Sequence, residues 1–295
     1  MRNARSCTST FAVSVVWRHG ARGRSRIAVS SSSQLARGAR FRQRDAARDL
    51  KRGYCGAAFR VKRSPVDRSG NSPDEWLSRY TNDPRLRSLV AALLEEPDPG
   101  TAHDTFEEIW WRDIVDSLSA LPALHSTGPA RVADAGSGIG FPALPLAVAL
   151  PTVQFTLIDS SQRKLHTARN LALRANIANV VFVHERLEHT GRGPLRERFD
   201  AALARALAPL PIALELTAPL VRVSGLVVVW RGRRNDVEER SAARAAEFLG
   251  LECGEVIATD PFPGARSLHL HLFHKRQPTP PRYPRNPARI RRSPL

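Results

Sequence analysis

Residues 131–142 read Arg-Val-Ala-Asp-Ala-Gly-Ser-Gly-Ile-Gly-Phe-Pro and join a strand-like segment to a helix-like one. The glycines at 136, 138 and 140 let the backbone turn sharply and approach a ligand with no β-carbon in the way. A nucleotide-like cofactor is the usual occupant of such a turn. A purely structural connection between strand and helix is the alternative interpretation of these glycines.

Strand-like and helix-like segments alternate from Ala130 onward, which predicts a parallel sheet covered by helices. The predicted strands are 131–135, 154–159, 180–184, 200–204, 225–230, 255–259 and 267–274. The predicted helices between them are 143–150, 162–175, 210–220 and 236–249. The last two strands have no helix between them and are linked by a turn at 261–264, so we expect an antiparallel pair that closes a doubly wound α/β sheet.

The spacing of the glycines distinguishes two classes of cofactor. Dinucleotide-binding folds use G-x-G-x-x-G, whereas here Phe141 stands where the last glycine of that pattern would fall, after Gly136, Gly138 and Gly140. This favours S-adenosylmethionine, an adenosine-plus-amino-acid ligand without a pyrophosphate to place at a helix N-terminus. Asp134 precedes the loop, where its carboxylate can meet the cationic amino-acid end of such a ligand.

Asp159 closes the second predicted strand, about 20 residues beyond the glycine loop. A carboxylate at this position can accept hydrogen bonds from two ribose hydroxyls. An acidic residue at a strand end is also common as a helix N-cap, which is the alternative. The loop and the acid together predict a Rossmann-like class I methyltransferase sheet over residues 129–276 and disfavour a nicotinamide-dependent oxidoreductase.

The segment before the sheet, residues 71–128, is predicted to be helical. Residues 74–80 and 84–94 form short amphipathic stretches, and a loop at 96–103 follows. Thr105 and Glu108 then match a capping box. Apolar residues recur every four positions and predict one buried stripe: Phe106, Trp110, Ile114 and Leu118.

The net charge of +17 is concentrated at the two ends of the chain. Residues 1–44 contain ten arginines and no acid, and residues 275–295 contain seven basic residues and no acid, so residues 45–274 are neutral overall. Clustered cations suit a phosphate-rich partner such as RNA. The proline-rich tail, residues 277–295, is predicted to contain no helix, to be extended and mobile, and to lie along phosphates or else remain as charge-solvated disorder.

Residues 1–70 have the Arg- and Ser-rich composition of an organelle transit peptide, free of acids until Asp45. A wrongly chosen start codon in an arginine-rich reading frame is the alternative. We therefore leave these residues out of the fold. A genuine leader predicts a plastid or mitochondrion, and a false one predicts a bacterial cytoplasm.

The three cysteines, Cys7, Cys55 and Cys253, are far apart and lack C-x-x-C spacing, so neither a disulfide framework nor a zinc site is expected. A membrane span needs about 18 consecutive apolar residues, and no stretch of the sequence approaches this length. We expect a protein that acts as a monomer, without a membrane or a metal.

Three stretches of the sequence, including the glycine loop, match the motifs of a known family: 134–146 (DAGSGIGFPALPL), 158–164 (IDSSQRK) and 199–206 (FDAALARA). They resemble successive motifs of the RsmG (GidB) family, small-subunit ribosomal RNA guanine-N7 methyltransferases. The helix 112–118 (RDIVDSL) and the tail, 278–287 (PTPPRYPRNP) with its final SPL, are also similar to that family. The resemblance covers about residues 104–295.

This resemblance implies a set of site residues. It implies cofactor contacts from Gly136, Phe141, Asp159, Ser160, Leu187 and Glu188. Asp134, Gly138 and Gly140 are expected contacts from the glycine-loop pattern itself. Leu187 and Glu188 would lie near the adenine. The resemblance also implies that Arg205 lies at the active site, and its position just past an apolar strand, at the carboxyl edge of the sheet, is consistent with this role. A surface ion pair is the alternative for Arg205.

The sequence also departs from the family. Residues 99–103 (PGTAH) replace a usual Asn-Leu-Thr segment, and Asp113 replaces a histidine common in the helix. Ala204 stands for the usual serine before the active-site arginine, and Arg231-Gly232 for a usual lysine-glycine. These changes leave the cofactor site credible and put the RNA-binding surface in doubt.

Guanine N7 offers an in-plane lone pair, so methylation there needs no general base, and none is evident in the sequence. Catalysis would come mainly from holding N7 and the methyl carbon in line, with Arg205 orienting the base or a phosphate. His269, His271 and His274 alternate along a predicted strand and are interpreted as strand packing rather than metal ligands. The alternatives are a methyltransferase for a small molecule or protein, and a non-catalytic RNA-binding remnant.

Overall fold

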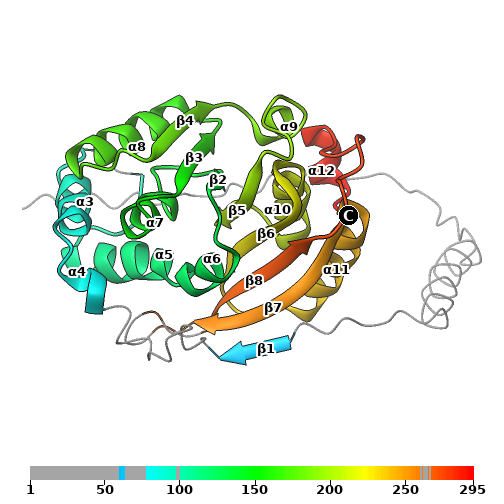
Figure 1. Ribbon diagram of the computed structural model, residues 1–295, viewed down its shortest axis with the longest axis horizontal. Helices are drawn as coiled ribbons and strands as arrows, with labels where there is room; N and C mark the ends of the chain where they lie inside the picture. Colours follow the sequence, from blue (N-terminus) through cyan, green and yellow to red (C-terminus); the bar gives the residue numbers. More distant parts are fainter. Residues whose placement is uncertain (1–59, 64–77, 98–99, 260, 262–264, 266) are drawn as a thin grey trace, which may run out of the picture. The chain divides into compact units, whose positions relative to one another are not determined.

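A mixed eight-stranded sheet forms the centre of the computed structural model, which describes residues 60–63, 78–97, 100–259, 261, 265 and 267–295 (Figure 1). The strand order is β1-β7-β8-β6-β5-β2-β3-β4. The strands are β1 (Arg60–Arg63), β2 (Arg131–Ala135), β3 (Gln154–Asp159), β4 (Val180–His184), β5 (Phe199–Arg205), β6 (Val221–Arg231), β7 (Leu251–Thr259) and β8 (Leu268–Lys275).

Most of the helices lie between these strands in the sequence, and the last of them follows β8. They are α3 (Pro84–Leu94), α4 (Phe106–Ile109), the π-helical η1 (Trp110–Val115), α5 (Asp116–Leu118), α6 (Leu121–Thr127), α7 (Ala143–Ala149), α8 (Gln162–Arg174), α9 (Leu187–Thr190), α10 (Leu210–Thr217), the 3-10 turn η2 (Ala218–Leu220), α11 (Asp236–Leu249) and α12 (Pro287–Arg292). None of those in the described part of the chain is long and apolar enough to cross a bilayer.

The pairing of the strands confirms the predicted fold class. β2 pairs in parallel with β3 and β5, and β6 continues the parallel sheet beside β5. β8 runs antiparallel to both β6 and β7, which is the predicted closing pair. Of the turn predicted to join β7 and β8, only Pro261 is described, so its geometry lies outside the described residues.

Helices bury their apolar residues on both faces of the sheet. Phe155 and Leu157 of β3 face one core, which includes residues of α3, α7 and α8. Ile158, one residue further along the strand, faces the opposite core with α10 and α11. This alternation follows from the period of two along a strand, and it places α8 and α11 on opposite sides of the sheet.

The N-terminal helices belong to the same core as the sheet. α3 has the predicted bounds, begins at the N-cap Asp83 and buries Leu86, Leu89 and Leu93. These residues share one core cluster with Val132 of β2. The predicted boundary at residue 128 therefore separates segments of the sequence but not two cores.

The predicted apolar stripe from Phe106 to Leu118 is wrong at its first position. Trp110, Ile114 and Leu118 are buried, whereas Phe106 is 37% exposed. Phe106 lies in the first turn of α4, past the edge of the core, and stacks on Trp110 with ring centroids 6.1 Å apart. The predicted cap is present, since the side chain of Thr105 accepts a hydrogen bond from the Glu108 amide at 3.2 Å.

Part of the segment that we left out of the fold is a strand. Arg60–Arg63 forms β1 and pairs in parallel with β7, from Glu255 to Ala258. The remaining residues of the predicted leader lie outside the described part of the chain. The leader therefore stays a prediction for those residues only.

The prediction of an extended, mobile tail without a helix is also wrong. Tyr283 and Ile290 are buried, and Pro287 begins the six-residue helix α12, where a proline is tolerated because the first amide of a helix has no partner. Arg196 donates to the carbonyls of Tyr283 at 2.8 Å and Thr279 at 2.5 Å. The tail is thus packed against the domain.

One cation of the tail, Arg285, forms an ion pair with a residue of the domain. Arg285 binds the buried carboxylate of Glu215, with Nη2 2.6 Å from Oε2 and Nε 2.8 Å from Oε1.

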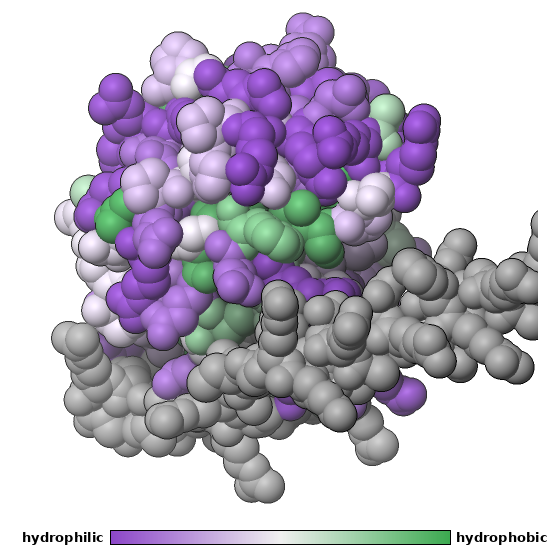
Figure 2. Space-filling model, turned by 90° about the vertical axis from the view of Figure 1, so that its right-hand side faces the viewer, coloured by the Kyte–Doolittle hydropathy of each residue, from purple (hydrophilic) through white to green (hydrophobic). Residues whose placement is uncertain are grey.

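Figure 2 shows the side of the domain on which α11 and α12 lie, where hydrophilic residues predominate and a hydrophobic strip crosses the surface.

Candidate active site

The predicted site residues gather at the carboxyl ends of three neighbouring strands. Asp134 lies near the end of β2, Asp159 ends β3 and Arg205 ends β5. Because β2 lies between β3 and β5, the glycine loop after β2 stands between the second acid and the arginine. Open α/β sheets bind ligands at this edge.

The three glycines of the loop have different roles. All adopt a positive φ, and the amides of Gly136 and Ser137 anchor the loop on the Ile158 carbonyl at 2.8 and 3.1 Å. A β-carbon on Gly136 or Gly140 would lie 2.6 Å or 2.4 Å from a leucine side chain, whereas one on Gly138 would meet nothing within 4 Å. Gly136 and Gly140 are therefore needed for packing, and Gly138 leaves open space on its side of the loop.

Asp159 connects the glycine loop to the end of β3 and does not cap a helix. Its Oδ2 accepts a hydrogen bond from the Gly138 amide at 2.9 Å, and its Oδ1 accepts one from Ser161 at 2.7 Å. The N-cap of α8 is Ser161, so the capping alternative does not hold. Each carboxylate oxygen keeps a lone pair that a ribose hydroxyl can use.

Asp134 is a buried carboxylate with one unsatisfied oxygen. Its Oδ2 accepts a hydrogen bond from the Ala143 amide at 3.2 Å, and its Oδ1 has no partner among the described residues. The hydroxyl of Ser137 is also buried and has no hydrogen-bond partner among the described residues. Burial raises the pKa of Asp134 to about 7. A cation bound next to this carboxylate would lower the pKa again.

Ser160, Leu187 and Glu188 occupy the ends of β3 and the segment after β4. Asp159 is the register partner of His184, whose Nε2 lies 3.0 Å from the Ser160 carbonyl oxygen. Leu187 is buried, and Glu188 lies within α9, 3.5 Å from the guanidinium of Arg186. Phe141, which follows the loop, is also buried.

Arg205 is held by residues of η1 and α5, the helical segments before β2. Its Nη2 lies 2.6 Å from Asp113 Oδ1, and its Nη1 donates to Ser117 Oγ at 3.2 Å. Asp116 Oδ2 is 3.6 Å away. The Arg205 side chain is only 19% exposed, so the alternative of an ordinary surface ion pair does not describe it.

Sequence reasoning missed the residues that hold Arg205. Asp113, Asp116 and Ser117 are spaced i, i+3 and i+4, which places polar groups on one helical face, and that spacing could have revealed them. Burial raises the pKa of Asp116 to about 6, although the nearby Arg205 opposes the shift. Asp113 was expected to disturb the RNA surface, but the structure places it against Arg205 and, through Oδ2, 2.8 Å from His103 Nδ1.

The structure also accounts for the other two residues that differ from the family pattern, Ala204 and Arg231. Ala204 is buried in the sheet, and Arg231 donates to the Ala208 carbonyl at 3.1 Å and to Glu238 at 2.5 Å. His271 is buried and lies 3.2 Å from Glu239. Among the described residues, no three His, Cys, Asp or Glu side chains are grouped to hold a metal.

Comparison with known proteins gives the family of this chain. The family model of rRNA small subunit methyltransferase G matches residues 100–260. The chain belongs to that family. Its ribosomal RNA small subunit methyltransferase G relative from Synechococcus sp. is 38% identical over 197 residues, covering 64% of this chain and 75% of the relative. The one from Deinococcus radiodurans is 37% identical over 205 residues, covering 68% and 79%.

These relatives confirm the resemblance to the RsmG (GidB) family and the expected class of enzyme, a ribosomal RNA methyltransferase. Among solved structures, cofactor-bound Rv0187 from MTB is 21% identical with a TM-score of 0.46, covering 70% of this chain and 98% of that one. In this member of the family, the candidate site consists of the glycine loop, Asp134, Asp159 and Arg205 with the helical residues that hold it.

Proposed function

We propose that the protein transfers a methyl group from S-adenosylmethionine to N7 of a guanine in small-subunit ribosomal RNA. The observation that carries the proposal is the position of Arg205, at the end of β5 beside the glycine loop strand and fixed by Asp113 and Ser117. An arginine aimed by two partners can recognise the O6 edge of guanine.

The residues around the glycine loop fit the proposed cofactor. Asp159 would bind the ribose hydroxyls, the Leu187–Glu188 segment would lie by the adenine, and Asp134 would face the cationic amino-acid part. The unsatisfied Oδ1 of Asp134 and the open side of Gly138 support this assignment. S-adenosylmethionine supplies an electrophilic methyl group on a sulfonium.

The side chains of this chain need not move a proton in the reaction. Guanine N7 attacks with its own lone pair and its product is cationic, so no base is required. The protein would hold N7 in line with the methyl carbon, and the carboxylates of Asp113 and Asp116 would lie near the positive charge that forms on the guanine. The intact anchor of Arg205 speaks against a non-catalytic remnant.

The first experiment is tritium transfer from labelled S-adenosylmethionine to small ribosomal subunits that lack their own N7 methylation. The full chain is compared with Arg205→Ala. Label recovered as 7-methylguanosine with the wild type, and at least about 100-fold less with the variant, supports the proposal. Cofactor binding without transfer to RNA would overturn the RNA substrate and direct attention to small-molecule or protein acceptors.

We also propose a monomer that works without a metal or a membrane. Light scattering at the assay concentration and activity after chelation test the first two points. The compartment stays a prediction with two outcomes, a plastid or mitochondrion if residues 1–70 include a genuine leader and a bacterial cytoplasm if they do not. Import of a fusion to residues 1–70 by isolated plastids would distinguish them.

A further inference from the structure

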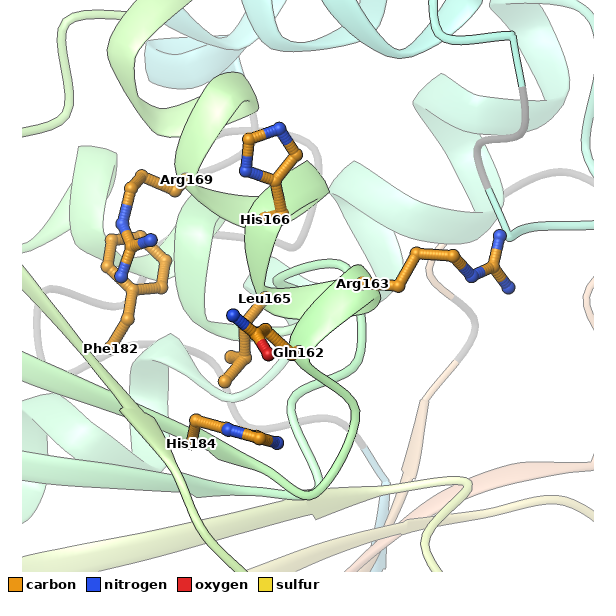
Figure 3. Close-up of a pocket in the computed structure, with 7 residues that line it drawn as sticks. All are labelled: Gln162, Arg163, Leu165, His166, Arg169, Phe182 and His184. Carbon is orange, nitrogen blue, oxygen red and sulfur yellow. The ribbon is translucent and has the colours of Figure 1, made fainter.

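A groove between α8 and β4 lies beside the proposed cofactor site (Figure 3). It has a volume of about 490 Å³ and combines basic, aromatic and amide side chains. The lining residues are Gln162, Arg163, Leu165, His166, Arg169, Phe182 and His184. The titratable residues among them are two arginines and two histidines, and no carboxylate lines the groove.

The arrangement follows from helical and strand spacing. His166 and Arg169 are three residues apart and are neighbours on the surface of α8, whereas Arg163 points away from Arg169 (Figure 3). Phe182 and His184 are two residues apart and share one face of β4. β4 is the last strand of the sheet on this side. Its edge therefore leaves the groove open to a large ligand.

Arg169 and Phe182 form a flat platform in the groove. The guanidinium carbon of Arg169 lies 5.1 Å from the centre of the Phe182 ring, and Figure 3 shows the two groups one over the other. Arginine planes and aromatic rings are the surfaces on which unpaired bases stack. The platform combines such a surface with a positive charge suited to phosphate.

The groove reaches the edge of the sheet where the cofactor residues lie. His184 is the register partner of Asp159, and its Nε2 lies 3.0 Å from the Ser160 carbonyl oxygen. A ligand that occupies the groove therefore ends next to the ribose-binding acid. This continuity connects the groove to the same reaction.

We propose that this groove binds a single-stranded segment of the substrate RNA that flanks the target guanine. An unstacked base lies against the platform of Arg169 and Phe182, and the backbone phosphate faces Arg169 and His166. This inference rests on the proposed function, because it takes RNA as the substrate. It places RNA contacts on the folded domain, at a surface independent of the basic tail.

The test uses Arg169→Gln and Phe182→Leu, with Arg240→Gln as the control. Arg240 is likewise an exposed arginine on a helix, but α11 lies on the opposite side of the sheet. Binding of transcribed small-subunit ribosomal RNA is measured by filter retention at several salt concentrations, and cofactor affinity and Tm are measured for each variant.

Both groove variants are expected to weaken RNA binding by about 5- to 20-fold, and Arg169→Gln to lower the slope of log affinity against log salt by about 1. Cofactor affinity and RNA binding by the control should not change. The Tm should stay the same for Arg169→Gln and fall only slightly for Phe182→Leu, because the Phe182 ring packs against the core. RNA binding by the wild type that both groove variants retain would overturn the groove alone. Absence of RNA binding by the wild type would overturn the RNA substrate and the groove together.

Discussion

Asp113 and Arg205 are 92 residues apart in the sequence, and their side chains meet with Nη2 2.6 Å from Oδ1. The carboxylate is almost fully buried, and its other oxygen lies 2.8 Å from His103 Nδ1. Each oxygen of Asp113 thus has a separate partner. The orientation of the proposed catalytic arginine depends on a residue in the helix that precedes the sheet.

Removal of that carboxylate should impair catalysis more than cofactor binding. Asp113→Asn keeps the size of the side chain but replaces the charge-assisted hydrogen bond, so kcat should fall about 10- to 100-fold. The Kd for S-adenosylmethionine should stay within about twofold, because the loop glycines are untouched. Glu107→Gln, on the exposed surface of α4, is the control, and equal kcat values for the two variants would refute the positioning role of Asp113.

The two glycines at 138 and 140 should respond differently to alanine. In Gly140→Ala the new β-carbon would lie 2.4 Å from Leu144 Cδ1, so we expect a loss of about 1–3 kcal/mol in the free energy of unfolding. In Gly138→Ala the β-carbon meets no atom, so stability should fall by only about 1 kcal/mol from the positive φ. Its main effect should be weaker cofactor binding, measured by calorimetry.

Asp134 should give the cofactor-free protein a specific pH dependence. Burial raises its pKa from 3.8 to about 7, so between those values the folded protein binds a proton that the unfolded chain does not. The free energy of unfolding should therefore fall as the pH rises from about 4 to about 7, by up to about 4 kcal/mol. Above about pH 7 the cost of the buried charge is fully present.

Urea denaturation at a series of pH values, for wild type and Asp134→Asn, isolates this contribution. The variant cannot ionise, so the difference between the two curves should grow from about pH 4 to about pH 7. The variant should also bind S-adenosylmethionine more weakly, since in the proposed site it lacks the charge that would face the amino group of the cofactor. Parallel curves for the two proteins would show that the carboxylate does not titrate as described.

The pair of Arg285 and Glu215 should determine whether the tail stays packed. Arg285→Met leaves the carboxylate of Glu215 buried without its cation, which should cost about 3–5 kcal/mol in the free energy of unfolding. Arg289→Met removes an exposed cation of α12 and should change stability by less than about 0.5 kcal/mol. A double variant with Glu215→Leu should recover part of the loss, and similar stabilities for both single variants would contradict the packed tail.

The parts of the fold that local patterns encode were predictable. β2, β3 and β4 have the predicted bounds, because each is an apolar run between turn residues. The glycine loop, Asp159 and Arg205 were placed at the correct edge of the sheet for the same reason. β6 begins at Val221, four residues before its predicted start, because it continues through Ser224, which has a positive φ that the sequence pattern does not reveal.

Other features depend on contacts between distant segments. β1 is a short charged segment that becomes a strand through its pairing with the edge of β7. The tail is ordered by Arg192, Arg196 and Glu215, about 70 to 90 residues earlier in the chain. The anchor of Arg205 is likewise a tertiary contact. None of these can be deduced from the composition of the segments themselves.

The position of β8 has a consequence for the synthesis of the protein. β8 follows every other strand in the sequence, yet it lies between β6 and β7 in the sheet. While translation has not reached residue 275, β6 and β7 each expose an unpaired edge, which is the form of a nascent chain most open to wrong pairing. A transcript that stops shortly before Leu268 would therefore yield a chain without its interior strand, and such a product should be degraded rather than retained as a smaller enzyme.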